Sequence, residues 1–323
     1  MKIQNFINGD FAEPISGNYF DNITPVTGEV YSQIPDSDSS DIDLAVSSAK
    51  EAFKSWSKLS KNERYDHIMH LADEIKANFD ELVEAESKDN GKPEWLARSV
   101  DIPRASENFR FFATASLHFD SEIHEMDGKA LNYTLRQPVG VVGCISPWNL
   151  PLYLLTWKIA PALAAGNTVV AKPSEITPMT AYLFSKICQK ADFPKGVINI
   201  VHGYGHKVGD ALSRHPDVPI ISFTGGTATG EKIAAVAAPM FKKLSLEMGG
   251  KNPNIIFEDA DFDNAVKMSA KAAFSNQGQI CLCGSRLFVQ ESIYDKFRTA
   301  VIQETQTLKV GDPKDEKSNL GAV

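Results

Sequence analysis

Two cysteines stand one residue apart in the segment FSNQGQICLCGSRLFV, residues 274–289. A disulfide between Cys281 and Cys283 would close a strongly strained ring. A zinc site would need further ligands, and no C-x-x-C or H-x-x-x-H run supplies them at the usual spacing. We therefore expect free thiols and no metal. The spacing by itself does not distinguish a nucleophilic thiolate from a buried thiol, so other segments must decide.

A carboxylate and a carboxamide in two other segments could serve a reaction at a cysteine. Glu247 follows the apolar run LSL and precedes Met248 and two glycines. Such a carboxylate could act as a general base through a water molecule, although a helix N-cap or an ion pair is the commoner role of a single glutamate. Asn149 in the segment SPWNLP could donate an amide hydrogen to a developing oxyanion, although asparagine is also typical of a turn.

Two further segments have the composition of nucleotide-binding loops. The segment FTGGTATG, residues 223–230, places glycines before a helix, whose N-terminus could bind phosphate. It lacks the lysine of a P-loop, and no G-x-G-x-x-G follows the first strand; a turn that needs glycine therefore stays open as the alternative. Lys172 and Glu175 in the segment KPSE could hydrogen-bond ribose hydroxyls or could belong to a solvated loop.

Each of these segments except the cysteine loop follows a short apolar strand in a region where strands and helices alternate. The expected strands are PVGVVGCISP, TVVAK, VINIV, PIISF and KKLSLE, and the expected helices cover residues 153–164, 178–190, 205–214 and 227–237. This alternation predicts an α/β fold with a parallel sheet covered on both faces. Ligands of such sheets bind beyond the carboxyl ends of the strands, which is where the polar and glycine-rich segments fall.

The regions on either side of this sheet have different patterns. The first forty residues are rich in turn formers, and three helices should follow, one starting with Ser40 as N-cap and two over residues 62–88 and 98–118. Residues 121–138 predict a β-hairpin that turns at Asp127-Gly128 and could pair with another subunit. Beyond residue 248, strands NPNIIF and RLFV should alternate with helices over 262–275 and 292–308.

The composition is that of an ordinary soluble protein. The chain has 323 residues, of which 43% are hydrophobic and 23% charged, and its net charge of −8 gives no basic surface for nucleic acid. No apolar run reaches the roughly 20 residues of a membrane helix, and the N-terminus MKIQNFINGDF lacks the apolar stretch of a signal peptide. We therefore expect a cytoplasmic protein that binds neither nucleic acid nor membrane.

The segments SPWNLP, KPSE, FTGGT, LEMGGKNP and NQGQICLCGSR, in this order and at these separations, resemble those of NAD(P)-dependent aldehyde dehydrogenases, and the resemblance covers the whole chain. It implies a Rossmann-type parallel sheet that binds the cofactor, an incomplete α/β catalytic domain and a projecting β-hairpin. The implied boundaries are 1–120 and 139–247 for the NAD-binding domain, 121–138 for an oligomerisation hairpin and 248–323 for part of the catalytic domain.

The resemblance assigns roles to single residues. In the family's G-Q-x-C pattern Cys281 is the nucleophile, and Cys283, at a position usually held by a small residue, is a bystander. Asn149 would hold the oxyanion together with the Cys281 backbone N–H, and Glu247 would activate the hydrolytic water. The implied cofactor is NAD, because the Glu175 carboxylate would repel a 2′-phosphate. The implied cofactor-binding residues are Ile145, Pro147, Trp148, Lys172, Ser174, Glu175, Gly205, Gly209, Phe223, Thr224, Gly225, Gly226, Met248 and Gly249.

Two segments, GQICLCGSR and DIPRASENFRFFA, are similar to those of the muconic semialdehyde dehydrogenase branch, which acts on 2-hydroxy- and 2-aminomuconic semialdehydes. There Arg104 would pair with the substrate carboxylate, as a guanidinium suits; the alternative is a surface salt bridge, and Arg110 is a weaker candidate. Betaine-aldehyde and fatty-aldehyde branches stay open. The family further implies a homodimer or homotetramer of the full-length form.

The chain has roughly two-thirds of the usual family length, so we expect a C-terminal truncation. The missing part would include an E-x-F-G-P segment and a final strand that completes a neighbouring subunit's sheet. One alternative function is therefore a catalytically impaired fragment that keeps NAD binding or subunit assembly. A phosphorylating dehydrogenase would also use a cysteine and NAD, but it needs a histidine base, and none of the seven histidines lies beside Cys281 in sequence.

Overall fold

The computed structural model describes residues 1–322. Its strands are β1 (Asn5–Ile7), β2 (Asp10–Ala12), β3 (Tyr19–Ile23), β4 (Val30–Pro35), β5 (Ile123–Met126), β6 (Ala130–Tyr133), β7 (Val141–Ile145), β8 (Thr168–Lys172), β9 (Ile198–Ile200), β10 (Ile220–Gly225), β11 (Lys243–Met248), β12 (Pro253–Ile256) and β13 (Arg286–Val289). Its α-helices are α1 (Ser39–Trp56), α2 (Lys61–Ala77), α3 (Phe79–Asn90), α4 (Glu94–Leu96), α5 (Ile102–Leu117), α6 (Pro151–Ala164), α7 (Met179–Lys190), α8 (Asp210–Arg214), α9 (Thr227–Ala237), α10 (Phe262–Phe274) and α11 (Tyr294–Gln306).

A seven-stranded sheet organises the described residues, in the order β11-β10-β7-β8-β9-β1-β2. Strands β7 to β11 run parallel, and the N-terminal β1 and β2 extend the sheet in antiparallel pairing. The carboxyl ends of β7, β10 and β11 therefore lie side by side at one edge of the sheet, with Thr224 on β10 opposite Glu247 on β11. The parallel α/β sheet predicted from the sequence is confirmed.

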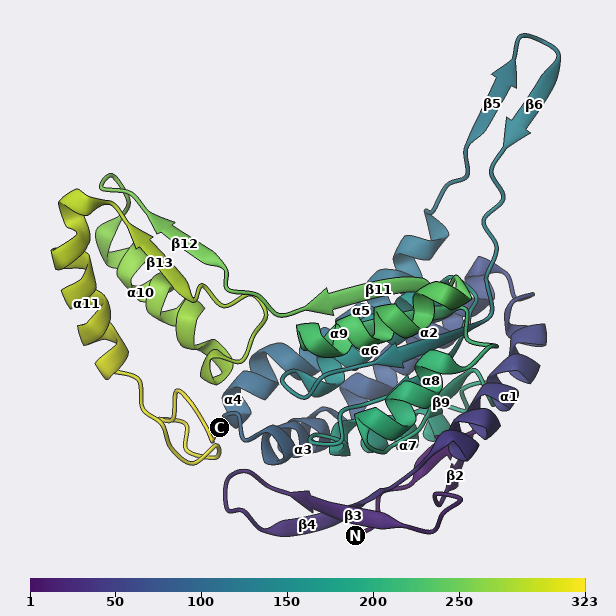
Figure 1. The fold of residues 1–323 in the computed structure, drawn as a ribbon, viewed down its shortest axis with the longest axis horizontal. Coiled ribbons are helices and arrows are strands. Elements are labelled where there is room, and N and C mark those ends of the chain that lie inside the picture. The colour runs from purple at the N-terminus through teal and green to yellow at the C-terminus, as the bar shows by residue number, and fades with distance from the viewer. Residues whose placement is uncertain (323) are drawn as a thin grey trace.

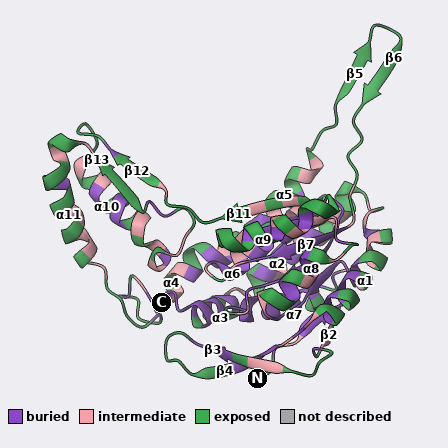
Figure 2. Ribbon diagram, viewed as in Figure 1, coloured by how far each residue is buried: buried purple, intermediate pink, exposed green. Residues whose placement is uncertain are grey.

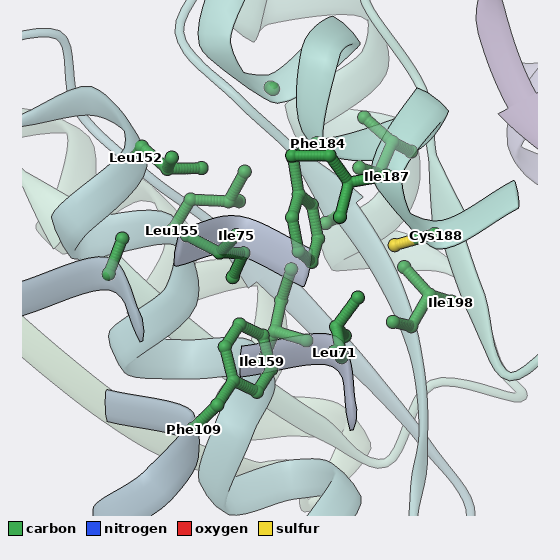
Figure 3. Packing of buried hydrophobic residues seen from close by; sticks show 14 of the residues in the cluster. Leu71, Ile75, Phe109, Leu152, Leu155, Ile159, Phe184, Ile187, Cys188 and Ile198 are labelled. Carbon is green, nitrogen blue, oxygen red and sulfur yellow. The ribbon is translucent and has the colours of Figure 1, made fainter. Parts of the chain in front are cut away.

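Helices cover both faces of this sheet because alternate residues of its strands point to opposite sides. On one face Val142, Cys144 and Val169 pack with helices α2, α5, α6 and α7. Figure 3 shows this cluster, in which Leu71 and Phe109 meet residues of α6 and α7. On the other face the neighbouring strand residues pack against α1, α8 and α9.

The N-terminal helices differ from the predicted ones at their ends. Asp38, not Ser40, is the N-cap of α1: its side chain accepts a hydrogen bond from the Ser40 N–H, and Asp41 completes a capping box. The predicted helix over 62–88 is two helices, because the backbone leaves helical geometry at Asn78. The Asn78 carboxamide donates to the Glu74 carbonyl at 2.7 Å and thereby caps the end of α2.

The hairpin β5–β6 projects far from the body of the molecule (Figure 1). Asp127 and Gly128 both have positive φ, at 47° and 71°, as the predicted turn requires. Its strand residues are all exposed (Figure 2).

A smaller unit follows β11. It pairs β12 with β13 in parallel, packs α10 and α11 on them around Ile256, Val266 and Phe297, and lies apart from the sheet in Figure 1. The cysteine segment connects α10 to β13 and turns back toward the main body, because the Asn149 side chain donates to the Gln279 carbonyl. Among the helices of residues 1–322, none combines the length and the apolarity that crossing a membrane requires.

Candidate active site

A cavity of about 360 Å³ opens at the carboxyl ends of β7, β10 and β11. It brings together four segments that are up to 130 residues apart in the chain. Its lining comprises Pro147, Trp148, Asn149, Leu154, Thr224, Gly225, Gly226, Met248, Gly249, Gly250, Gly278, Gln279, Ile280 and Cys281. The predicted nucleophile, the predicted oxyanion donor and seven of the fourteen predicted cofactor-binding residues therefore share one cavity.

The two cysteines differ in their surroundings. Cys281 is exposed and lines the cavity, whereas Cys283 is buried and does not line it, and both are free thiols. The Asn252 carboxamide donates to the carbonyls of both cysteines, at 2.6 and 3.2 Å, and so fixes the loop between them. Only Cys281 has the access that a nucleophile needs.

The approach to Cys281 is an unusual backbone turn. Asn276, Gln277 and Gly278 follow one another with φ of 51°, 57° and 73°, all in the left-handed region. Each non-glycine residue there costs roughly 1–2 kcal/mol, so neighbouring contacts must stabilise the turn. One of them is the Asn276 carboxamide, which donates to the Asn149 carbonyl at 3.0 Å. Such strain is typical of functional loops.

Asn149 ties this turn to the sheet. Its side-chain Nδ2 donates to the Gln279 carbonyl at 2.6 Å, two residues before Cys281. Asn149 and Cys281 line the same cavity, as the predicted role of Asn149 as an oxyanion donor requires.

Glu247 is exposed on β11, beside Thr224 of β10, and does not line the cavity itself. Lys158 of α6 reaches the same neighbourhood and donates to the Thr224 hydroxyl at 2.6 Å. Burial lowers the pKa of Lys158, and the charges of the Cys144 and Glu247 side chains partly offset this. The sequence analysis missed Lys158; the signal was a single lysine in the otherwise apolar helix PLYLLTWKIAPALA.

A second cavity, of about 380 Å³, collects four of the predicted cofactor residues, Ile145, Glu175, Gly205 and Gly209. The Glu175 carboxylate accepts from the Gly205 N–H at 3.1 Å and pairs with the buried Lys172 ammonium. Burial by itself would raise the pKa of Glu175, but Lys172 and the N–H donors outweigh it and lower that pKa. The carboxylate is therefore ionised and held in one place.

The residues around these cavities leave room for a dinucleotide. A Cβ atom at Gly209, Gly226 or Gly249 would meet nothing within 4 Å, so a ligand can approach the backbone there. Gly226 is the N-cap of α9, and the first turn of that helix has N–H groups that no side chain caps. These features fit the pyrophosphate of NAD.

Three predicted cofactor residues support the walls instead of lining them. Phe223 is buried in β10, and a Cβ at Gly225 would lie 2.5 Å from its ring, so only glycine fits above it. The Ser174 hydroxyl accepts from the Ile176 N–H and shapes the loop before α7. Lys172 is buried and acts on the cavity through Glu175.

The two arginine candidates lie on α5. The Arg104 guanidinium donates to the Tyr153 hydroxyl at 3.2 Å and lies 3.6 Å from Glu107, with about half of its side chain exposed. Tyr153 belongs to the first turn of α6, directly after Asn149. Arg110 pairs with Asp73 of α2, farther along the helix. Of the two, Arg104 is the one whose guanidinium hydrogen-bonds a residue of α6, the helix that follows Asn149.

Comparison with known proteins identifies the family to which this architecture belongs. The family model described as Aldehyde dehydrogenase family matches residues 11–323. The 2-aminomuconic semialdehyde dehydrogenase of Homo sapiens is 53% identical over the whole of this chain, and the 2-hydroxymuconic semialdehyde dehydrogenase of Pseudomonas sp. (strain CF600) is 45% identical. The chain spans 66% of the length of the human relative and 68% of that of the Pseudomonas relative.

A solved structure of the indole-3-acetaldehyde dehydrogenase AldA from P. syringae, a mutant in complex with NAD⁺ and IAA, superposes with a TM-score of 0.97. It is 39% identical in sequence, and the match covers 100% of this chain and 66% of that one. The family model and the solved structure each match nearly the whole of this chain. The chain belongs to the aldehyde dehydrogenase family.

Proposed function

We propose that this chain oxidises an aldehyde to its carboxylic acid with NAD, through a thiohemiacetal and a thioester at Cys281. The observation that carries the proposal is the hydrogen bond between the Asn149 carboxamide and the Gln279 carbonyl. It brings an amide donor and an exposed thiol to one cavity at the carboxyl ends of the parallel strands.

The reaction follows from these groups. The Cys281 thiolate adds to the aldehyde carbon, and the carbonyl oxygen becomes an alkoxide that the Asn149 amide and the Cys281 N–H stabilise. Bound NAD would supply the acceptor for the hydride that leaves this carbon, so that the adduct at Cys281 becomes a thioester. We assign the general base to Glu247, which would have to turn from its exposed position on β11 toward the cavity to take a proton from water. The resulting hydroxide displaces the thiolate and releases the acid.

The cofactor assignment rests on the second cavity. Its ionised Glu175, held by Lys172 and the Gly205 N–H, suits the ribose hydroxyls of NAD and would repel the 2′-phosphate of NADP. The similar AldA structure is itself a complex with NAD⁺.

The substrate class follows from Arg104 and from the relatives. A half-exposed guanidinium next to the first turn of α6 can bind a carboxylate at the far end of a short aldehyde. The relatives named above are muconic semialdehyde dehydrogenases. We therefore propose a carboxylate-bearing muconic semialdehyde as substrate. A homodimer or homotetramer and a cytoplasmic location stay predictions from the sequence.

The test is NADH formation by the 323-residue chain with 2-hydroxymuconic semialdehyde and with a simple aliphatic aldehyde. Turnover should be lost in Cys281→Ser and kept within about twofold in the matched control Cys283→Ser, because only Cys281 faces the cavity. Binding of NAD without turnover would instead support a fragment that keeps cofactor binding or assembly. Equal loss in both cysteine variants would contradict the assignment of the nucleophile.

A further inference from the structure

A cluster of buried charged side chains contacts the backbone of Asn149. Lys92, Glu86 and Asp101 have side chains with no exposed surface. The Lys92 ammonium lies 3.1 Å from the Asp101 carboxylate and 4.0 Å from that of Glu86. These residues come from the end of α3, the turn after it and the π-helical turn before α5. Nothing in the reaction proposed above uses them.

The cluster contacts the active-site backbone through Lys92. Its Nζ donates to the main-chain carbonyl of Asn149 at 3.0 Å. Asn90, two residues earlier, donates from its carboxamide to the Trp148 carbonyl at 2.9 Å. Two successive carbonyls of the segment that bears the oxyanion donor are therefore held by side chains of one turn.

The turn itself is built to present these two side chains. Gly91 between them has φ of 79°, the left-handed conformation that ends α3. A Cβ there would lie 2.9 Å from Pro25 and 3.2 Å from Ala322, so glycine is required. The Ser87 hydroxyl donates to the Lys92 carbonyl at 2.6 Å and fixes the exit from the turn.

The charge balance suits a rigid support. Burial raises the pKa of Glu86 to about 7, with a further rise from the Asp101 carboxylate, and burial also raises the pKa of Asp101. Lys92 thus faces two carboxyl groups whose pKa values burial raises, and its own charge partly offsets both shifts. A buried ion pair is a weak source of stability compared with apolar packing, whereas it fixes geometry well because its partners lose their bonds when displaced.

We propose that Lys92 is a positioning residue of the active site: its ion pair with Asp101 and its hydrogen bond to the Asn149 carbonyl fix the backbone from which the Asn149 carboxamide reaches the Cys281 loop. The catalytic part of this inference rests on the proposed function. The part that concerns the Asn149 backbone stands on the structure alone. Preorganised donors act only if their support holds them in place.

The first test does not depend on turnover. In Lys92→Met, which keeps the length of the side chain and removes its charge, amide hydrogen exchange in residues 148–153 should accelerate about tenfold or more, with β8 unchanged. The control Asp89→Asn alters another buried carboxylate nearby, in the last turn of α3, which accepts hydrogen bonds from the Met179 N–H and the Asn22 carboxamide and has none with Asn149. It should leave exchange in residues 148–153 unchanged. Unchanged exchange in Lys92→Met would overturn the inference whether or not the chain is active.

The second test separates positioning from general stability. Lys92→Met should lower kcat about 10- to 100-fold, as a misplaced oxyanion donor would. NAD affinity and the rate at which iodoacetamide alkylates Cys281 should stay within about twofold, since alkylation forms no oxyanion. In an Asn149→Ala background, Lys92→Met should cause no further loss, because it acts through Asn149.

The other possible outcomes also distinguish a positioning role of Lys92 from a purely structural one. A further loss of kcat in the Asn149→Ala background, or a parallel loss of alkylation, would show a structural role only and overturn the inference. Absence of turnover in the unmodified chain would count against the proposed function, while the exchange result still decides the role of Lys92. If Lys92→Met does not fold, Asp101→Asn removes the ion pair at constant size, and it should give a smaller acceleration confined to the same residues.

Discussion

The Arg104 guanidinium is the group by which we propose that the site distinguishes a carboxylate-bearing aldehyde from an aliphatic one. Its guanidinium contacts Tyr153 and, loosely, Glu107, so a substrate carboxylate could take over those bonds. Hydrogen bonds to charged groups contribute about 1.5–3 kcal/mol. Arg104→Met should therefore raise KM for 2-hydroxymuconic semialdehyde about 10- to 100-fold and leave KM for an aliphatic aldehyde nearly unchanged.

Arg110→Met provides the matched control for Arg104, since it removes the same charge from the same helix but breaks only the pair with Asp73. Both KM values should stay close to those of the unmodified chain. If Arg104→Met raised the two KM values equally, its effect would lie in the shape of the site and not in carboxylate recognition.

His202 should make the fold sensitive to acid. It is buried just after β9, its Nε2 has no hydrogen-bond partner among residues 1–322, and burial together with the Lys172 charge lowers its pKa from 6.5 to about 3. The unfolded chain takes up a proton below pH 6.5 while the folded chain does not. The contribution of His202 is therefore full above pH 6.5 and is lost as the pH falls toward 3, by about 2 kcal/mol between pH 8 and pH 5.

The comparison with His202→Leu isolates this effect. Glu86 and Asp89, whose pKa values are raised by burial, change stability in the opposite direction with pH, but they do so equally in both proteins. The free energy of unfolding at pH 5, taken relative to that at pH 8, should therefore be about 2 kcal/mol higher in His202→Leu than in the unmodified chain, as measured by urea unfolding. The same pH dependence in both would mean that His202 is protonated, or free to become so, in the folded state.

At the scale of elements, the packing of α1 on the sheet depends on one glycine. Gly196 precedes β9 with φ of 77°, and a Cβ there would lie 2.8 Å from the Ser48 hydroxyl and 2.9 Å from the Ser48 carbonyl. Gly28 has nearly the same φ, 74°, and open space around it. Gly28→Ala should cost about 1 kcal/mol for its backbone alone, and Gly196→Ala about 3 kcal/mol or more because α1 must shift. Urea unfolding at constant m-value measures both; equal costs would mean that α1 moves freely.

The elements that the sequence predicted best are those whose signal is local. Buried parallel strands are continuous β-branched runs such as TVVAK, and α9 occupies the predicted residues 227–237 because a glycine pair ends the strand before it. The break at Asn78 was missed because the apolar spacing continues across it. Local periodicity cannot show where a helix changes direction to follow the core.

In the candidate site, too, the residues with a local sequence signal were predicted and those without one were missed. Cys281 and Asn149 were predicted from motifs that are each contiguous in sequence. Lys92 and Lys158 were not, because a charged residue is ordinarily exposed and their partners lie far away: Lys92 meets Asn149, 57 residues on, and Lys158 meets Thr224, 66 residues on. Buried charge is a property of the folded arrangement and has no local pattern.

At the scale of the whole molecule, the hairpin β5–β6 projects from the body, and all of its strand residues are exposed to solvent (Figures 1 and 2). Its two faces differ. Ile123, Leu131 and Tyr133 share one face with Glu125, each of the three apolar side chains being at least 60% exposed. The other face pairs His124 with Asn132 and Met126 with Ala130. Isolated two-stranded hairpins are marginal in water, so an apolar face of this kind favours a second copy of the chain as its partner.

This arrangement predicts which substitutions dissociate an oligomer. Ile123→Asp with Leu131→Asp places two charges on the apolar face and should shift the mass measured by light scattering toward the monomer, because burying unpaired charges in an interface is costly. His124→Asp with Asn132→Asp adds two charges to the opposite face of the same strands and should leave the mass unchanged. NAD affinity should be unaffected in both, since the hairpin lies outside the two cavities. Equal dissociation by the two pairs would show that added charge acts on the hairpin as a whole, and an unchanged mass in both would place the subunit contact elsewhere on the molecule.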